Sequence, residues 1–230
     1  MTQALALSPE GQLKLVIFDC DGVLVDSEQT CCQISAEEAR AAGLNIPAEK
    51  AVEEFSGMAL PEIQKDIEKK TGKILGSDWA DRVQKRFVQA MKQGVEPIDG
   101  VHAMLEGVQK LGLPVRVGSN SSVEEMDAKF IATDMTHYFT NRVHSARDMG
   151  VPKPRPDVYL HAAREEGVSP ANCVVLEDSN TGARAAVDAG MMCVLLRPGT
   201  EPVPDWPNLI RIHHLSEFAP LLQKALQSQG

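Results

Sequence analysis

Short runs of apolar residues recur along the chain, and each is followed by small or acidic residues and then by a helical pattern. Runs that are apolar at nearly every position are typical of strands buried on both faces, as in a parallel sheet. The predicted strands are Leu15–Phe18, Val115–Val117, Cys173–Leu176 and Met192–Leu196, with Val143–Ser145 as a shorter fifth.

Helical patterns alternate with these runs. The expected helices are Val101–Leu111, Val123–Thr133, Pro156–Gly167, Thr181–Ala189 and Ser216–Gln227. Such an alternation predicts an α/β fold, with a Rossmann-like parallel-sheet core and helices on both faces of the sheet.

The interval from Asp26 to about Pro97 breaks the alternation, because its pattern is helical throughout and contains no strand run. Its expected helices, separated by Gly and Pro residues, are Gln29–Ala42, Ala48–Phe55, Leu60–Thr71 and Trp79–Gly94. We interpret this interval as a small inserted all-helical domain. The predicted domains are therefore an α/β core over 1–25 and 98–230 and a helical insert over 26–97.

The length of 230 residues allows a core domain that carries a smaller insert. The chain has 23 Lys and Arg against 32 Asp and Glu, which gives a net charge of −9, and it has no basic run. Nucleic acid is therefore not an expected partner. A small anionic substrate would need a local cluster of cations and hydrogen-bond donors, because the average field of the protein repels it.

The cellular location is inferred from what the sequence lacks. Residues 1–12 do not have the charge and apolar pattern of a signal peptide, and no apolar run approaches the length of a membrane span. Five cysteines without CxxC spacing suggest reduced packing thiols rather than disulfides or a zinc site. We expect a cytoplasmic protein without a membrane partner.

Candidate chemistry lies at the ends of the predicted strands, where open α/β sheets bind their ligands. Asp19 and Asp21 follow the first strand, and Gly22 allows the chain to turn sharply. Two neighbouring carboxylates repel each other, which favours a bound divalent cation or a shared proton. The alternative for this short motif alone is a turn or a helix cap.

Two further strand ends carry groups that could bind an anion. The segment Gly118–Ser122 places Ser119 and Asn120 before a helix, where hydroxyl and backbone N–H groups can donate to phosphate, although such residues also serve as caps. Lys153 lies between Pro152 and Pro154, which stiffen the backbone around its ammonium group. Directed at a carboxylate, this charge would favour the ionised form and also bind a phosphoryl oxygen.

Glu177 and Asp178 come directly after the predicted strand Cys173–Leu176. Adjacent carboxylates after a buried strand are costly unless they are paired or bound to a cation. Together with Asp19 and Asp21 they form an oxygen-rich set without thiolates, which suits Mg²⁺.

These four segments, in this order, resemble the haloacid dehalogenase (HAD) superfamily, and the stretch Asp19-Cys20-Asp21-Gly22-Val23-Leu24-Val25-Asp26-Ser27-Glu28 is similar to the opening of its phosphatase and β-phosphoglucomutase branch. The resemblance implies that Asp19 attacks phosphorus to form an aspartyl-phosphate. It also implies that Asp21 is the general acid and base. Dehalogenases of the superfamily lack the second aspartate, so halide displacement is disfavoured.

The same resemblance assigns the other site residues. Ser119 and Asn120 would contact the phosphoryl group, and Lys153 would neutralise charge on the nucleophile and the phosphate. The metal residues would be Asp19, Asp21 through its backbone carbonyl, Asp178, and Glu177 directly or through water, with Mg²⁺ as the cofactor.

The insert resembles the small cap of this branch, with hinges near Asp26–Glu28 and Glu96–Gly100. Closure of a cap excludes water from the reaction. The loop Phe55–Leu60 lies where the branch places a substrate-contacting turn, so Gly57 is a candidate substrate-binding residue. The alternative for this loop is a simple connection between helices.

Two departures bear on the reaction. β-Phosphoglucomutases carry a histidine after the first hinge and an arginine in the cap loop, whereas this chain has Cys31 and the turn Ser56–Met58. A phosphatase is therefore favoured over a phosphosugar mutase, and a binding protein without catalysis is disfavoured because the four core residues are all present. Cys20 inside the first motif, the region of Cys31 and the pair Asn172-Cys173 resemble those of bacterial sugar phosphatases similar to 6-phosphogluconate phosphatase. The expected substrate is a small phosphorylated metabolite, a sugar or sugar-acid phosphate, acted on by a monomer or weak homo-oligomer.

Overall fold

The computed structural model of the chain describes residues 7–9 and 11–229. The expectation that residues 1–12 carry no targeting signal concerns mainly residues outside this range. Among the described residues, no helix combines the length and the apolar character needed to cross a membrane.

A six-stranded parallel sheet forms the core of the molecule. Its strands are β1 (Leu15–Phe18), β4 (Val115–Ser119), β5 (Val143–Ser145), β6 (Cys173–Glu177), β7 (Met192–Leu196) and β8 (Leu209–Ile212). They lie in the order β5-β4-β1-β6-β7-β8, and each neighbouring pair is parallel. The predicted Rossmann-like core is confirmed. Because β1 is central and the chain adds strands first on one side and then on the other, the crevice for a ligand lies at the carboxyl end of β1.

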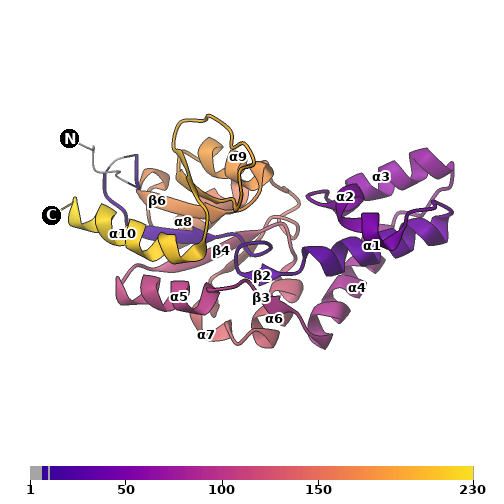
Figure 1. Cartoon of the computed structure of the whole chain (residues 1–230), viewed down its shortest axis with the longest axis horizontal. Helices are drawn as coiled ribbons and strands as arrows, with labels where there is room; N and C mark the ends of the chain where they lie inside the picture. Colours follow the sequence, from indigo (N-terminus) through magenta and orange to yellow (C-terminus); the bar gives the residue numbers. More distant parts are fainter. Residues whose placement is uncertain (1–6, 10, 230) are drawn as a thin grey trace.

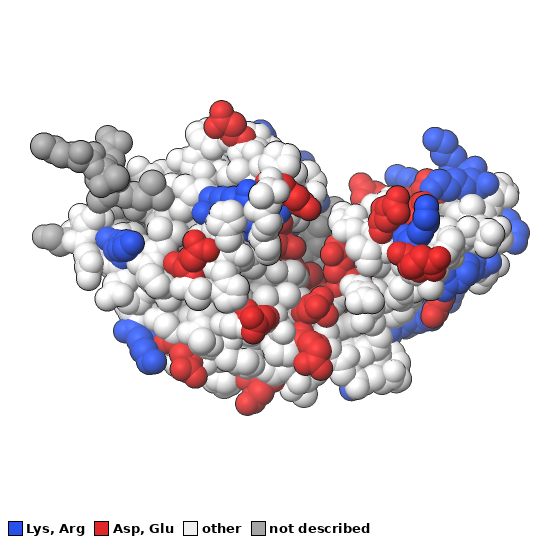
Figure 2. All heavy atoms as spheres, in the orientation of Figure 1, with Lys and Arg blue, Asp and Glu red and all other residues white. Residues whose placement is uncertain are grey.

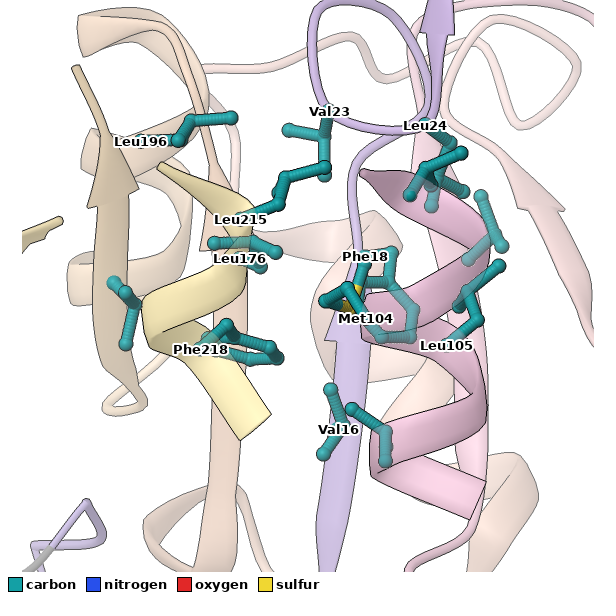
Figure 3. Close-up of a cluster of buried hydrophobic side chains, with 14 of the residues drawn as sticks. Val16, Phe18, Val23, Leu24, Met104, Leu105, Leu176, Leu196, Leu215 and Phe218 are labelled. Carbon is teal, nitrogen blue, oxygen red and sulfur yellow. The ribbon is translucent and has the colours of Figure 1, made fainter. Parts of the chain in front are cut away.

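Helices cover both faces of the sheet (Figure 1). They are α5 (Val101–Lys110), α6 (Val123–Ala132), α7 (Thr136–Phe139) and α10 (Phe218–Gln227) on one face, and α8 (Asp157–Glu166) and α9 (Asn180–Asp188) on the other. Strand β1 alternates between the two apolar layers: Val16 and Phe18 join the first, and Leu15 and Ile17 join the second. Figure 3 shows the first layer, where Phe18 lies near Met104 of α5 and Phe218 of α10.

Strand β8 and helix α7 were not predicted from the sequence. The segment of β8 is only partly buried over three of its four residues and contains Arg211, so it lacks a continuous apolar run. Edge strands often lack a continuous apolar run, because one of their sides is exposed to solvent. The segment becomes a strand by pairing with β7, and the pattern of its own residues does not predict that partner.

The inserted segment forms a helical cap with its own apolar core. Its helices are α1 (Glu28–Ala42), a 3-10 turn Ala48–Lys50, α2 (Ala51–Phe55), α3 (Leu60–Thr71) and α4 (Trp79–Gln93). Trp79, Ile67 and Ala36 are among its buried residues, and none of them belongs to the two apolar layers of the sheet. The predicted fold class, with its small all-helical insert, is thus confirmed, while the boundaries 25/26 and 97/98 stay a prediction.

The two connections between core and cap correct one expectation. The interval was predicted to contain no strand, but β2 (Val25–Asp26) and β3 (Glu96–Pro97) pair antiparallel where the chain enters and leaves the cap. The pairing places Val25 opposite Pro97 and Asp26 opposite Glu96. The prediction failed because a two-residue strand is too short to show a period and depends on a partner about 70 residues away.

Candidate active site between core and cap

The first pair of carboxylates lies where β1 ends. The backbone N–H of Asp19 donates to the carbonyl of Leu176 on β6 at 2.9 Å, which continues the pairing of the two strands up to Asp19. Gly22 has a φ of 76°, and a Cβ there would lie 2.0 Å from Oδ2 of Asp178. Glycine is therefore needed for both the turn and the close approach of Asp178.

Lys153 lies buried between two acidic strand ends. Its Nζ donates to Oδ1 of Asp19 at 2.7 Å and to Oε1 of Glu177 at 2.8 Å. Its backbone N–H donates to Oδ1 of Asn120 at 2.9 Å, so Asn120 fixes the Lys153 loop as well as lining the cavity. Burial alone would lower the pKa of Lys153, but Asp19 and Glu177 outweigh it and raise the pKa. The ammonium group therefore stays charged at physiological pH.

Glu177 is fully buried and engaged by protein donors at both oxygens. Oε1 also accepts from the Tyr159 hydroxyl at 2.6 Å, and Oε2 accepts from the backbone N–H groups of Asp178 and Ser179, each at 3.1 Å. A Cβ on Gly182 would lie 1.6 Å from Oε1, so the start of α9 packs directly on this carboxylate. The arrangement lets Glu177 orient Lys153 and the loop that presents Asp178.

Three carboxylates beside the end of β1 could hold a metal ion. Ligand atoms of Asp19, Glu177 and Asp178 all lie within 4.8 Å of one another. Burial raises the pKa of Asp19 to about 7, with Glu177 adding to the effect, and burial followed by Glu177 raises the pKa of Asp178. No hydrogen bond to the Asp178 carboxylate is found within the described chain. A cluster of buried oxygens that disfavours ionisation fits a hard divalent cation, which would supply the missing positive charge.

The second aspartate is held by a different set of groups. Oδ1 of Asp21 accepts from the Ser27 hydroxyl and from Nζ of Lys129 at 2.5 Å, and Oδ2 accepts from the hydroxyls of Ser121 at 2.8 Å and Ser119 at 3.4 Å. Burial alone would raise the pKa of Asp21, but the charge and hydrogen bond of Lys129 lower it. Ser119 thus lies against Asp21 and faces the same cavity as Asp19.

Lys129 was not among the site residues predicted from the sequence. It lies on α6 with a side chain that is 0% exposed, next to the apolar residues Met126 and Phe130. The available signal was a lysine on the apolar face of a predicted helix. Pattern analysis alone cannot distinguish such a residue from one whose ammonium group extends to solvent.

A cavity of about 690 Å³ lies between these groups and the cap. Figure 2 shows acidic side chains around the hollow between the two parts. The cap residues that line it include Cys31, Phe55, Met58, Leu60 and Gln84. Their side chains are mainly apolar, and the others carry thiol, hydroxyl, amide or carboxylate groups. Among the described residues, no Lys, Arg or His of the cap lines the cavity. Gly57 lines the cavity too, at a turn where its φ is 72°.

The sequence profile of the haloacid dehalogenase-like hydrolases matches residues 16–196. The chain belongs to the haloacid dehalogenase-like hydrolase family. It is 31% identical over 217 residues to 6-phosphogluconate phosphatase of Escherichia coli, covering 93% of this chain and 96% of that protein. The match confirms the predicted family and, with relatives that are named phosphatases, the predicted enzyme class of phosphoric monoester hydrolase.

Two solved structures show how far the similarity extends. A HAD family hydrolase from Deinococcus radiodurans with bound phosphate and sodium is 28% identical, with a TM-score of 0.69 over 94% of this chain and 97% of that one. β-Phosphoglucomutase from Clostridium difficile has a TM-score of 0.75 over 94% of this chain and 98% of that one, at 18% identity. The second likeness concerns the fold alone.

Proposed function

We propose that the protein is a Mg²⁺-dependent phosphatase that hydrolyses a small sugar or sugar-acid phosphate through an aspartyl-phosphate on Asp19. The observation that carries the proposal is the convergence of Asp19, Lys153 and Asp178 at one side of a cavity whose other side is lined by residues of the cap. Phosphate bound to the Deinococcus relative supports a site for a phosphoryl group in this fold.

The first step uses the carboxylate that Lys153 holds. Lys153 donates to Oδ1 of Asp19, and the other oxygen is left to attack phosphorus. The bond from phosphorus to the leaving oxygen breaks, and protonated Asp21 gives its proton to that oxygen. Ser119 and Asn120, at the end of β4, would donate to the phosphoryl oxygens.

The second step reverses the proton transfer. Asp21, now ionised, takes a proton from water as the water oxygen attacks phosphorus, and the bond to Asp19 breaks to release phosphate. Lys129 lowers the pKa of Asp21, which favours the ionised form used in this step over the protonated form used in the first. Mg²⁺ held by Asp19, Asp178 and the Asp21 carbonyl would neutralise charge on the phosphoryl oxygens. Glu177 would act on this site by fixing the Asp178 loop.

The composition of the cap supports hydrolysis rather than a mutase reaction. A bisphosphorylated intermediate needs a second cationic site, and the cap offers none among the described residues that line the cavity. Arg147 of the core also lines it, but its guanidinium donates to Asp81 of the cap at 2.8 Å.

The cysteines of the described chain are all free thiols, which supports the proposed cytoplasmic location. The expectation of a monomer or weak homo-oligomer stays a prediction.

A substrate panel tests the proposed function. With Mg²⁺ present, we expect phosphate release from monophosphates of neutral sugars, polyols or sugar acids, and little from sugar bisphosphates, because the cap lacks cations for a second phosphate. Phosphate release is measured for each compound, and interconversion of glucose 1-phosphate and glucose 6-phosphate is followed in parallel. Interconversion faster than phosphate release would contradict the proposal and favour a mutase.

The proposed metal site predicts a pH-dependent stabilisation by Mg²⁺. Between about pH 4 and pH 7 the contribution of Asp19 to the stability of the metal-free protein falls as pH rises, because its raised pKa means that this carboxyl binds more protons in the folded state than in the unfolded one. Mg²⁺ requires the ionised carboxylates, so its stabilising effect should grow as pH passes through about 7.

The measurement compares melting temperatures with MgCl₂ and with EDTA at acidic and alkaline pH. At a hundredfold excess over the dissociation constant the gain is about 2.7 kcal/mol, or roughly 5–10 °C for a chain of this size. Asp178→Asn should lose the gain. An equal gain at both pH values, or a gain retained in Asp178→Asn, would exclude this metal site.

A further inference from the structure

The proposed chemistry assigns no role to Lys129, although its ammonium group contacts the proposed acid and base. Nζ of Lys129 lies 2.5 Å from Oδ1 of Asp21 and 2.5 Å from Oε1 of Glu125 on the same helix, and it also donates to the Ser121 hydroxyl at 3.0 Å. The side chains of Lys129 and Glu125 are 0% and 3% exposed. The structure has therefore placed two charged groups inside the protein, in contact with the Asp21 carboxylate, whose side chain is 33% exposed.

Stability does not account for this arrangement. Removing two or more charges from water costs several kcal/mol that their attraction recovers only partly, and apolar side chains of similar size are usually as stable or more so. Met126 and Phe130, which flank Lys129, are buried in the apolar layer of the core. A purely structural residue at this place would be expected to be apolar as well.

The contacts of Asp21 indicate what the lysine does. An ionised carboxylate has about four acceptor positions, and Lys129, Ser27, Ser121 and Ser119 approach the two oxygens of Asp21. Of these four partners, Lys129 is the one with a full charge, and it comes from a helix on the core. It therefore fixes the direction in which the carboxylate points more strongly than the hydroxyls do.

The same contacts extend to the cap. The Gln84 side-chain amide on α4 donates to Oε2 of Glu125, and α4 packs against α6. A continuous chain of hydrogen bonds thus runs from the cap through Glu125 and Lys129 to Asp21. When the cap shifts on α6, the Gln84–Glu125 contact must change, and the restraint on Lys129 changes with it.

We propose that Lys129 is a positioning residue for Asp21, and that the Gln84–Glu125 contact makes the orientation of Asp21 depend on how the cap lies on the core. The proposal rests on the proposed function, in which Asp21 transfers the proton. Lys129 itself does not touch the substrate: it holds Asp21 at the point from which the leaving oxygen, and later the water, can be reached.

The test separates the step that needs no proton from those that do. p-Nitrophenyl phosphate has a leaving group that departs without protonation, so nitrophenol release with enzyme in excess reports attack by Asp19 alone. Turnover of a sugar phosphate also needs Asp21. For Lys129→Met we expect nitrophenol release close to that of the parent and sugar-phosphate turnover lower by about 10²-fold, the lower range of acid and base catalysis. Acid-quenched phosphoenzyme should accumulate.

Controls address folding and the cap. Lys92→Met removes an exposed ion pair of 3.1 Å with Glu124, between the same two helices, and should leave both rates unchanged. Where Lys129→Met does not fold, Lys129→Met combined with Glu125→Gln removes the buried charges together and should show the same split. Gln84→Leu should lower the kcat for the sugar phosphate without slowing nitrophenol release.

Three outcomes would overturn the proposal. Equal losses of both rates in the lysine variants would mark Lys129 as structural, and unchanged rates would mark it as dispensable. Unchanged rates in Gln84→Leu would show that the Gln84–Glu125 contact does not couple the cap to Asp21. Failure of the proposed function is seen separately, because the parent enzyme would then release no nitrophenol and form no phosphoenzyme.

Discussion

Replacing Asp19, the proposed covalent nucleophile, by Asn is expected to lower turnover by about 10⁴-fold or more, because loss of a nucleophile removes the reaction path and not merely a contact. Asn keeps the size of the side chain and one acceptor for the Lys153 ammonium group, so the floor of the cavity should keep its shape. Phosphate release from the best substrate of the panel measures the effect, and acid quenching should trap no phosphoenzyme.

The stability of this variant separates loss of chemistry from loss of fold. Burial raises the pKa of Asp19 to about 7, which means that the buried site disfavours the ionised carboxylate. A neutral amide should therefore not lower the melting temperature. Asp188→Asn, at an exposed ion pair on α9, is the matched control and should leave turnover unchanged. Full turnover in Asp19→Asn would show that the nucleophile is another residue.

Replacing Lys153 by Met is expected to reduce both turnover and stability. The ammonium group contacts two buried carboxylates, at 2.7 Å from Asp19 and 2.8 Å from Glu177, and its side chain is 4% exposed. Loss of one preorganised electrostatic group costs about 10²–10³ in kcat. Loss of one partner of a buried ion pair costs about 3–5 kcal/mol, because the remaining charge stays buried.

The loss of stability should depend on pH in a defined direction. Without Lys153, a proton can neutralise Asp19, whose pKa is already about 7 with the lysine present. The penalty should therefore be greatest at alkaline pH and should shrink as pH falls through the raised pKa. Melting temperatures of parent and variant across this range measure it. Lys110→Met, which breaks an exposed pair with Glu106, is the control and should change stability by about 0–1 kcal/mol. A Lys153→Met protein that melts with the parent would refute the assigned ion pair.

Much of the fold could be predicted because the deciding signals are local. Val174, Val175 and Leu176 are buried on both sides of the sheet, and their continuous apolar run showed it. The helical cap was predicted for the same reason, since its helices follow one another without a strand run. Strand β8 and the β2–β3 ribbon were missed because each is short or half-exposed and is defined by its partner strand.

In the candidate site, too, the residues that local signals mark could be predicted from the sequence, whereas their contacts could not. Asp19, Asp21, Ser119 and Asp178 lie at or just after the ends of strands, so the rule that parallel strands present their carboxyl ends at one edge was enough to bring them together. Lys153 was singled out by its flanking prolines, and the structure places its Nζ on Asp19 across 134 residues of sequence. That contact required the loop after β5 to fold back over the end of β1, which the order of the strands makes possible.

The sequence by itself determined the α/β core, the helical insert and the groups that meet at the strand ends, because periodicity and strand-end position are properties of neighbouring residues. Only the tertiary structure decided that Lys129 contacts Asp21, which is 108 residues away, and that Glu125 connects this pair to Gln84 of the cap. The physical reason is that a buried charge is tolerated where its partners surround it, and those partners are brought together by the packing of α6 on the sheet and on α4 of the cap.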